Sequence, residues 1–369
     1  MQLIQCSREA LLKPLQTVGG LIEVRSSLPI LGNILINKEQ ERVVFAATDT
    51  EIEIRTEAMI GDGAESFATT VPAGKLTAFL NGLPQSAASV RLEGDDKKVV
   101  LRSGRSQCSL ATQPAADYPS MPVEDMPTRF TLPAAVLHHL LQMVRFAMAQ
   151  QDVRYYLNGA LLEASAGGVR AVTTDGHRLA CCDAKDQIDE AVTVNAILPR
   201  KTVLMLTKLL PENDTEVTVE IGAKQVRFTF GDISMLSKLV EGQFPDYNRV
   251  IPVNNDKNFL VNREELIGAL RRCAIVANEK FKGQRWIITP GKLQIESTNG
   301  GMEEAVEEIA IDYEGEELDM GFNVTYLLDV LGNLKNAEVR FAFSSSQGAT
   351  LLTLPESDRF RYVLMPMRI

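Results

Sequence analysis

Histidine and cysteine are scarce in this chain, and their scarcity limits the chemistry that the protein can perform. The three histidines, at positions 138, 139 and 177, have no metal-ligand spacing, and the five cysteines, at 6, 108, 181, 182 and 273, form no Cys-x-x-Cys pair. The adjacent Cys181 and Cys182 would point to opposite faces of a strand. We therefore expect free thiols in a reducing compartment and no metal site.

Long apolar runs are also missing. No stretch approaches the ~18 residues of a membrane span, and residues 1–14 carry charges where a signal peptide would be apolar. We therefore expect a cytoplasmic protein with no membrane partner. A phosphate-binding Gly-x-x-x-x-Gly-Lys-Ser/Thr loop is absent as well, and no cofactor is expected.

One short run leaves a catalytic alternative open. Thr174-Asp175-Gly-His177-Arg places a carboxylate close to an imidazole, as a hydrolase would require. No candidate nucleophile motif accompanies Asp175 and His177, so we expect no catalytic residues and no enzyme activity. The hydrolase hypothesis predicts that His177→Ala abolishes turnover.

The chain contains the same pattern of predicted elements three times, at intervals of about 125 residues. Two amphipathic helix patterns recur in a fixed order; they begin near Ser7, Leu132 and Asn262, and near Val71, Leu198 and Phe322. Between them lies a strand that ends in a polar pair: Thr48-Asp49, Thr174-Asp175 and Thr298-Asn299. Repetition on this scale indicates a protein built for its shape, because an enzyme needs only one active site.

Each repeat closes with a predicted β-hairpin, at residues 89–104, 216–232 and 337–354, in which apolar and polar residues alternate. Residues 118–128 and 250–258 are rich in proline or small polar residues, which is typical of linkers. At 40.6 kDa the chain is too large for one core. We predict an α+β fold of three domains, at 1–122, 129–250 and 256–369, each with two helices on antiparallel sheet.

Charge is distributed unevenly along the chain. The whole sequence carries a net charge of −10, yet the six helix patterns hold eleven Lys or Arg and only four acidic residues. The helices therefore sum to +7 and the remainder of the chain to −17. Helices that lie side by side could form one basic surface that binds a polyanion, while the acidic sheets repel it elsewhere.

Several longer motifs identify the chain as similar to a known family. They are Leu11-Leu-Lys-Pro, Leu28-Pro-Ile-Leu-Gly-Asn, Asp152-Val-Arg-Tyr-Tyr-Leu-Asn-Gly, Thr174-Asp-Gly-His-Arg-Leu, Phe244-Pro-Asp-Tyr, Asn278-Glu-Lys-Phe, Gly321-Phe-Asn-Val and Tyr362-Val-Leu-Met-Pro-Met-Arg-Ile. Together they resemble the bacterial β sliding clamp, the processivity subunit of DNA polymerase III. The resemblance implies a head-to-tail homodimer whose six domains close a ring around duplex DNA, with helices lining the hole.

The resemblance also implies partners: sequence-independent double-stranded DNA, the replicative polymerase, an ATP-dependent clamp loader, and other polymerases and repair proteins that carry short linear motifs. For DNA, it points to Arg25, Gln151, Tyr155, Tyr156, Arg200 and Lys201. Arg200 and Lys201 open a helix, where cations and backbone N–H groups suit a phosphate. One of the two adjacent tyrosines could instead belong to the core. Gly74 stands where the family often has a basic residue.

For the dimer interface, the resemblance implies an apolar pair and glutamates facing basic residues of a second copy: Ile275, Val276, Glu303, Glu304, Glu307 and Glu308, with Lys75, Lys98 and Arg105 opposite. The glutamates could also form a solvated strand face, because exposed ion pairs contribute only ~0.2–1 kcal/mol each. Gln107 stands where an arginine is usual and Gly301 where a glutamate is usual.

The family also has a pocket for partner peptides. The matching positions here are Leu157, Thr174, Gly176, His177, Arg178, Leu179, Pro245, Arg249, Val250, Asn323, Tyr326, Val363, Leu364, Met365, Pro366, Met367 and Arg368. Flexible methionines suit a pocket that must accept different partners. A remaining alternative is a structural repeat protein that oligomerises without DNA.

Overall fold

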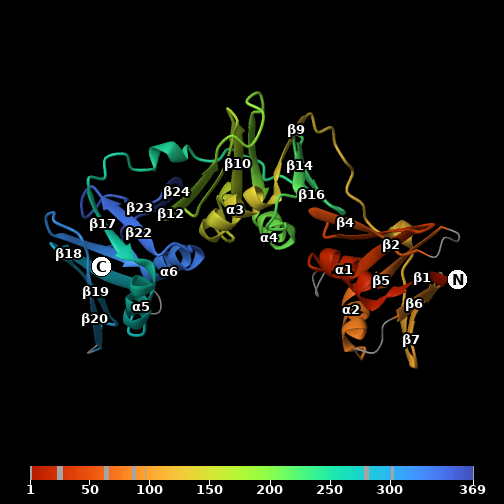
Figure 1. Cartoon of the computed structure of the whole chain (residues 1–369). Helices are drawn as coiled ribbons and strands as arrows, with labels where there is room; N and C mark the ends of the chain where they lie inside the picture. The colour runs from red at the N-terminus through yellow and green to blue at the C-terminus, as the bar shows by residue number, and fades with distance from the viewer. Residues whose placement is uncertain are drawn as a thin grey trace. The chain divides into compact units, whose positions relative to one another are not determined.

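The computed structural model describes residues 2–22, 28–61, 66–84, 89–95, 97–277, 282–300 and 303–368. Contacts between Cα atoms divide the chain into two compact units, Met1–Ala135 with Met205–Leu239, and Val136–Leu204 with Val240–Ile369. Figure 1 labels all six α-helices and many of the strands of the two units. The division follows the sheets that the strands join, and the three domain boundaries expected from the sequence stay a prediction.

The first unit contains two antiparallel sheets. One has eight strands in the order β5-β2-β3-β4-β16-β15-β14-β9, and the other has four in the order β1-β6-β7-β8. The bounds are β1 Gln2–Ser7, β2 Asn33–Glu39, β3 Arg42–Thr48, β4 Ile52–Met59, β5 Phe67–Pro72, β6 Ser89–Gly94, β7 Lys98–Ser103, β8 Ser106–Ala111, β9 Thr128–Pro133, β14 Glu216–Ile221, β15 Gln225–Phe230 and β16 Ile233–Lys238.

The second unit repeats this composition. Its eight-stranded sheet has the order β13-β10-β11-β12-β24-β23-β22-β17, and its four-stranded sheet the order β20-β19-β18-β21. The bounds are β10 Gly159–Ser165, β11 Gly168–Thr174, β12 Arg178–Ala184, β13 Val194–Pro199, β17 Lys257–Asn262, β18 Gly283–Thr289, β19 Lys292–Thr298, β20 Glu304–Ala310, β21 Leu318–Asn323, β22 Glu338–Phe343, β23 Thr350–Leu354 and β24 Ser357–Leu364.

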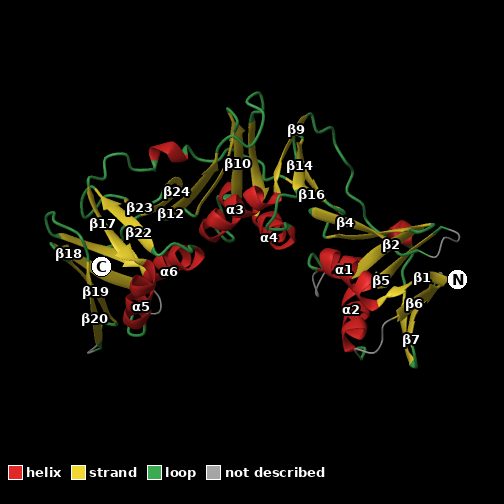
Figure 2. Ribbon diagram, in the orientation of Figure 1, coloured by secondary structure: helices red, strands yellow, loops and turns green. Residues whose placement is uncertain are grey.

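The helix patterns of the sequence all form helices, drawn in red in Figure 2. They are α1 Arg8–Gly19, α2 Ala73–Gly82, α3 Ala134–Val144, α4 Arg200–Leu209, α5 Arg263–Ala274 and α6 Val324–Asn333, with short 3-10 helices at Pro29–Gly32, Ala115–Asp117, Arg145–Ala147, Tyr155–Leu157 and Tyr247–Arg249. Polar residues cap three of them: Ser7, Asn262 and Asn323 each accept a backbone N–H of the first turn. In α1, buried Leu11, Leu15 and Val18 recur at helical spacing and face the sheet.

The three predicted hairpins also form, as β6–β7, β14–β15 and β22–β23. The first predicted linker, however, is hydrogen-bonded to the turn between β14 and β15. Glu124 accepts hydrogen bonds from the backbone N–H groups of Lys224 (2.6 Å) and Gln225 (2.7 Å). Gln225 donates in turn to the Pro122 carbonyl at 2.8 Å. The segment is therefore an ordered strap within the first unit.

Two strand pairs join different repeats inside the units. The last strand of the second repeat, β16, pairs with β4 of the first, and Met235 lies opposite Ile54. The last strand of the third repeat, β24, pairs with β12 of the second, and Tyr362 lies opposite Ala180. These residues occupy equivalent positions in their repeats, because Met235 pairs with Phe228 of β15 as Tyr362 pairs with Leu352 of β23. The same junction is therefore built twice, in the same register.

Candidate functional site

Three residues of the predicted peptide pocket belong to one buried apolar cluster in the second unit. Leu157, Leu179 and Val363 are each almost fully buried and pack in one cluster. Leu179 of β12 lies directly opposite Val363 of β24. Val250 and Met365, by contrast, expose 43% and 45% of their surface. The predicted residues therefore supply a buried floor and exposed apolar edges.

The backbone brings the C-terminal segment to this cluster. β24 continues the pairing with β12 as far as Arg178 and Leu364. Beyond the strand, the Met365 N–H donates to the His177 carbonyl at 3.0 Å, and the Met367 N–H donates to the Gly321 carbonyl at 2.8 Å. The segment 362–368 is thus held on both sides and forms a fixed wall.

Arg178 is the buried polar centre of the pocket region. Its guanidinium donates to Asp175 (3.0 Å), to Asp329 of α6 (2.7 Å) and to the Phe146 carbonyl (2.8 Å). It also lies over the Tyr326 ring, 4.3 Å from the centroid. His177 stacks on the same ring at a centroid distance of 6.4 Å. The sequence reasoning missed Asp329, although a buried arginine always requires acidic or carbonyl partners.

The Asp175 and His177 neighbourhood builds a turn. Asp175 Oδ1 accepts the backbone N–H groups of His177 (2.9 Å) and Arg178 (3.1 Å), and Thr174 Oγ1 accepts that of Gly176. The equivalent Thr48 and Asp49 of the first repeat make the same bonds at the same offsets. A turn found in two repeats, only one of which carries a histidine, is structural, and the hydrolase alternative loses its support.

The remaining predicted pocket residues lie around this turn and the C-terminal segment. Asn323 is the N-cap of α6 and accepts the Thr325 N–H at 2.9 Å. Pro245, Arg249 and Val250 lie on the segment 244–251, where Arg249 is highly exposed and paired with Asp246 at 2.9 Å. Leu364, at the end of β24, is fully buried and belongs to the core beneath the C-terminal segment.

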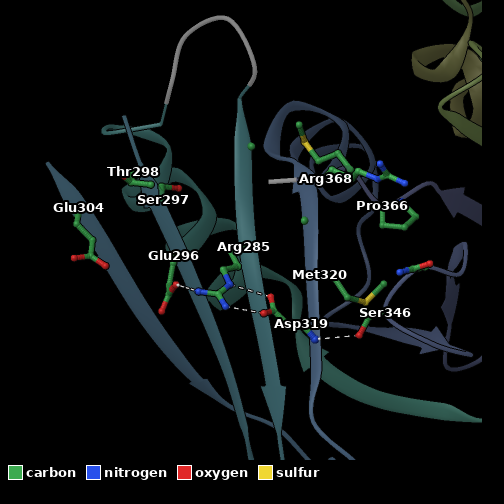
Figure 3. A pocket seen from close by; sticks show the side chains of 14 residues that line it. Arg285, Glu296, Ser297, Thr298, Glu304, Asp319, Met320, Ser346, Pro366 and Arg368 are labelled. Atoms are coloured by element: carbon green, nitrogen blue, oxygen red, sulfur yellow. Dashed lines mark hydrogen bonds and ion pairs between the residues drawn. The ribbon is translucent and has the colours of Figure 1, made fainter. Parts of the chain in front are cut away.

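A surface cavity of about 960 Å³ lies beside the C-terminal segment. Figure 3 shows Arg285 between Asp319 and Glu296, with Pro366 and Arg368 at the opposite rim. Arg285 donates to both carboxyl oxygens of Asp319, at 2.9 and 2.6 Å, and to Glu296 at 3.4 Å. The central charges of the cavity thus neutralise one another, and three predicted pocket residues, Pro366, Met367 and Arg368, line it as well.

The residues predicted to contact DNA fall in two places in the second unit. Tyr155 exposes 57% of its surface, whereas Tyr156 is partly buried and packs against the apolar cluster. Only Tyr155 is therefore a surface residue. Gln151 is exposed with a φ of 55°. Arg200 and Lys201 begin α4, and the Arg200 side chain donates to the Met148 carbonyl at 3.2 Å. Arg25 lies outside the described residues.

The residues predicted for the dimer interface lie at the free sides of the two four-stranded sheets. Ile275 follows α5 and is 81% exposed, which is unusual for an isoleucine; Val276 is half-buried. Glu304, Glu307 and Glu308 belong to the edge strand β20, and Glu303 precedes it. Lys98 begins β7, Arg105 precedes the edge strand β8, and Lys75 is exposed on α2.

The glutamates of β20 differ in their surroundings. Glu307 accepts a bidentate pair of bonds from Arg272 of α5, at 2.6 and 2.7 Å, and Arg272 holds the pKa of that carboxyl below its usual value. Glu308 pairs with Lys292 at 3.0 Å, and Glu303 bonds to Asn299. Gln107 of β8, at the position of the usual arginine, accepts from Arg102. Gly301 and the Asn278-Glu-Lys-Phe motif lie outside the described residues.

Other candidate chemistry is missing from the described ranges. There, no group of three or more His, Cys, Asp or Glu side chains could hold a metal ion, and no helix is long and apolar enough to cross a membrane. Three α+β repeats, with sheets that continue from one repeat to the next, are the architecture of the DNA clamp class. Comparison with known proteins identifies the family.

The chain belongs to the DNA polymerase III beta subunit family. Models of the N-terminal, central and C-terminal domains of that subunit match residues 1–122, 131–246 and 248–368. The beta sliding clamps of Pseudomonas aeruginosa and Escherichia coli are each 42% identical to it, over 362 and 364 residues and 98% of both chains. Its function is therefore that of the sliding clamp of DNA polymerase III, a processivity factor and not an enzyme.

Solved structures agree with this membership. The sliding clamp of Pseudomonas aeruginosa bound to griselimycin is 42% identical, with a TM-score of 0.95 and complete coverage of both chains. The polymerase III beta subunit of Caulobacter crescentus is 35% identical, with a TM-score of 0.92 and complete coverage. These neighbours confirm the predicted α+β clamp fold.

Proposed function

We propose that two copies of this chain close head-to-tail into a ring of six domains, bounded in each chain at 1–122, 129–250 and 256–369, that encircles duplex DNA. The observation that carries this proposal is the pairing rule between repeats. β16 pairs with β4 and β24 with β12, which leaves β8 of the first repeat and β20 of the third at the edges of four-stranded sheets. Pairing β8 of one copy with β20 of the next completes an eight-stranded sheet and covers both edges.

The repeated register specifies this seam. Cys108 is the equivalent of Met235 and Tyr362, because it lies opposite Leu101 of β7 as they lie opposite Phe228 and Leu352. Glu304 is the equivalent of Leu179, because it lies opposite Thr298 as Leu179 lies opposite Thr174. The next residue, Ala305, is therefore the equivalent of Ala180. In the proposed seam, Cys108 of one copy therefore lies opposite Ala305 of the other.

The same register brings Arg105 opposite Glu308, an attractive pair at the rim of the seam. Beyond α5, the exposed Ile275 and the half-buried Val276 provide the apolar part of the interface. Lys75 and Lys98 provide further positive charge. Because Glu307 is already paired with Arg272, it orients the edge of its own sheet.

We propose that DNA is retained by topology and that phosphate contacts are weak. The six helix patterns of the sequence together carry a surplus of seven positive charges in each chain. Tyr155, Gln151, Arg200, Lys201 and Arg25 supply additional contacts. Weak, sequence-independent contacts permit sliding, whereas the closed ring prevents loss.

We propose that the pocket built from Leu179, Val250, Val363 and Met365 binds short linear motifs of the replicative polymerase, of an ATP-dependent clamp loader and of repair proteins. A motif of the form Gln-x-x-Leu-Phe would bury two or three large side chains at ~1.5–3 kcal/mol each, less the ordering cost, which gives micromolar affinity. Partners of this kind support a cytoplasmic location.

The experiment that tests encirclement compares DNA topologies. The protein is loaded by a clamp loader and ATP onto a nicked circle, and retention is followed by gel filtration in salt that abolishes direct binding to linear DNA. We expect retention on the circle and release after a restriction enzyme linearises it. Equal loss from circular and linear DNA would contradict the ring and favour a repeat oligomer that does not encircle DNA.

A further inference from the structure

One face of the second unit's large sheet carries an apolar area and a charged area in adjacent rows. Leu179 lies opposite Val363, and two residues further along β12, Cys181 lies opposite Val172. The next row on the same face contains Glu163 of β10, Arg170 of β11 and Asp183 of β12, each opposite the next. Side chains two residues apart share a face, so the charged row borders the pocket floor.

The segment 244–251 lies on this face and supplies one wall of the proposed pocket. Phe244 and Tyr247 are buried in the same cluster as Leu157, Leu179 and Val363. The turn that presents Val250 is built on Tyr247, whose carbonyl accepts the N–H groups of Val250 (3.0 Å) and Ile251 (3.2 Å). The position of Tyr247 therefore determines the position of Val250.

The Tyr247 hydroxyl is fixed by the charged row. It donates to Glu163 at 2.5 Å and accepts from Arg170 at 2.7 Å. Burial raises the pKa of Tyr247 to about 12, and the bond to Glu163 contributes in the same direction. The hydroxyl thus stays protonated as a donor, and its two partners come from two different strands.

The charged row also reaches the opposite wall of the pocket. Arg170 bonds to Asp183, and Asp183 bonds to Arg361 of β24, two residues before Val363. The Arg361 side chain also lies 3.4 Å from Cys181 Sγ. A continuous set of hydrogen bonds therefore links the segment that carries Val250 to the strand that carries Val363.

We propose that Tyr247, with Glu163 and Arg170, is a positioning group for peptide binding: it holds the 244–251 wall at the correct distance from the C-terminal wall. The proposal rests on the proposed peptide pocket. Tyr247 is only 4% exposed, so it acts through the walls that it holds and not by touching the peptide. Preorganised walls bind more tightly than walls that must be ordered on binding.

The test is Tyr247→Phe, measured as the affinity and dissociation rate of a fluorescent Gln-x-x-Leu-Phe peptide, together with the thermal midpoint. We expect roughly five- to tenfold weaker binding, mostly through faster dissociation, from loss of the hydroxyl bonds. Tyr118→Phe is the matched control: its hydroxyl is also buried and bonded, to Thr48 and Asn33, but in the first unit. We expect this control to bind the peptide as the unchanged protein does.

A second pair of variants separates positioning from folding. Glu163→Gln retains an oxygen that can accept from Tyr247, and we expect near-normal affinity; Glu163→Ala should weaken binding as Tyr247→Phe does. A lower thermal midpoint with unchanged peptide affinity in Tyr247→Phe and Glu163→Ala would overturn the proposal. Failure of the proposed pocket would look different: the unchanged protein would then not bind the peptide, or Val363→Asp would bind it as tightly as the unchanged protein does.

Discussion

At the scale of single residues, Asp175 and His177 belong to one sequence motif but have different roles: Asp175 holds the turn, and His177 lies on the surface. Asp175 accepts two backbone N–H groups and the Arg178 guanidinium, whereas His177 is exposed. We expect Asp175→Ala to reduce the free energy of unfolding by about 2–4 kcal/mol, because it removes one of the two acidic partners of the buried Arg178 guanidinium and breaks the turn. His177→Ala should cost less than about 1 kcal/mol.

Fluorescence of Trp286, the only tryptophan and a buried residue of the same unit, during urea unfolding measures both changes. Equal losses in the two variants would contradict the turn-building role of Asp175.

The buried thiols of Cys181 and Cys182 predict a stability that depends on pH. Burial raises the pKa of each to about 12, from an ordinary value of 9.0. The thiols' contribution to the free energy of unfolding is complete below pH 9. It is lost as the pH rises towards 12, because the same thiols ionise at lower pH in the unfolded chain than in the folded one. We expect the thermal midpoint to fall above pH 9, and to fall less steeply in Cys182→Ala. The same slope in both proteins would exclude Cys182 as a cause.

At the scale of elements, the strap that follows Tyr118 depends on one carboxylate. Glu124 accepts hydrogen bonds from the Lys224 and Gln225 N–H groups at the β14–β15 turn. The carboxylate lies so close to Gly222 that a Cβ there would be 2.4 Å from Glu124 Oε1, so the site requires glycine. We expect Glu124→Ala to cost about 1–3 kcal/mol. Hydrogen exchange of the two amides measures the effect, and Asp125→Ala, an exposed neighbour, is the control. Unchanged protection in Glu124→Ala would show that the strap is held by other contacts.

At the scale of the whole molecule, the repeated register makes the dimer testable with a native thiol. Ala305→Cys should form a disulfide with Cys108 of a second copy under mild oxidation, because opposite residues of antiparallel strands have Cβ atoms about 4.5–5.5 Å apart. We expect cross-linked dimers on a non-reducing gel, and none when Cys108→Ser is added. A dimer in sedimentation that never cross-links would contradict this register.

The apolar part of the seam gives an independent prediction. Ile275→Asp with Val276→Asp would bury unpaired charges in the interface, at a cost of several kcal/mol. We expect monomers in sedimentation, with the circular dichroism spectrum of the unchanged protein. A persistent dimer would assign the seam to another surface.

The sequence by itself determined what depends on neighbours along the chain. Helical spacing placed all six helices and alternation placed the hairpins, because periodicity acts within a few residues along the chain. The motifs also carried the clamp resemblance that the comparisons confirm, and with it the pocket and seam residues, which stay predictions.

Only the tertiary structure decided which distant groups meet. The β4–β16 and β12–β24 pairs join strands more than 170 residues apart, and the bonds from Tyr247 to Glu163 and Arg170 cross about 80 residues. It also decided that Tyr156 turns inward while Tyr155 stays exposed, and that Glu307 is already paired with Arg272. Local patterns contain no information about such partners, because long-range pairing is selected by the packing of whole sheets.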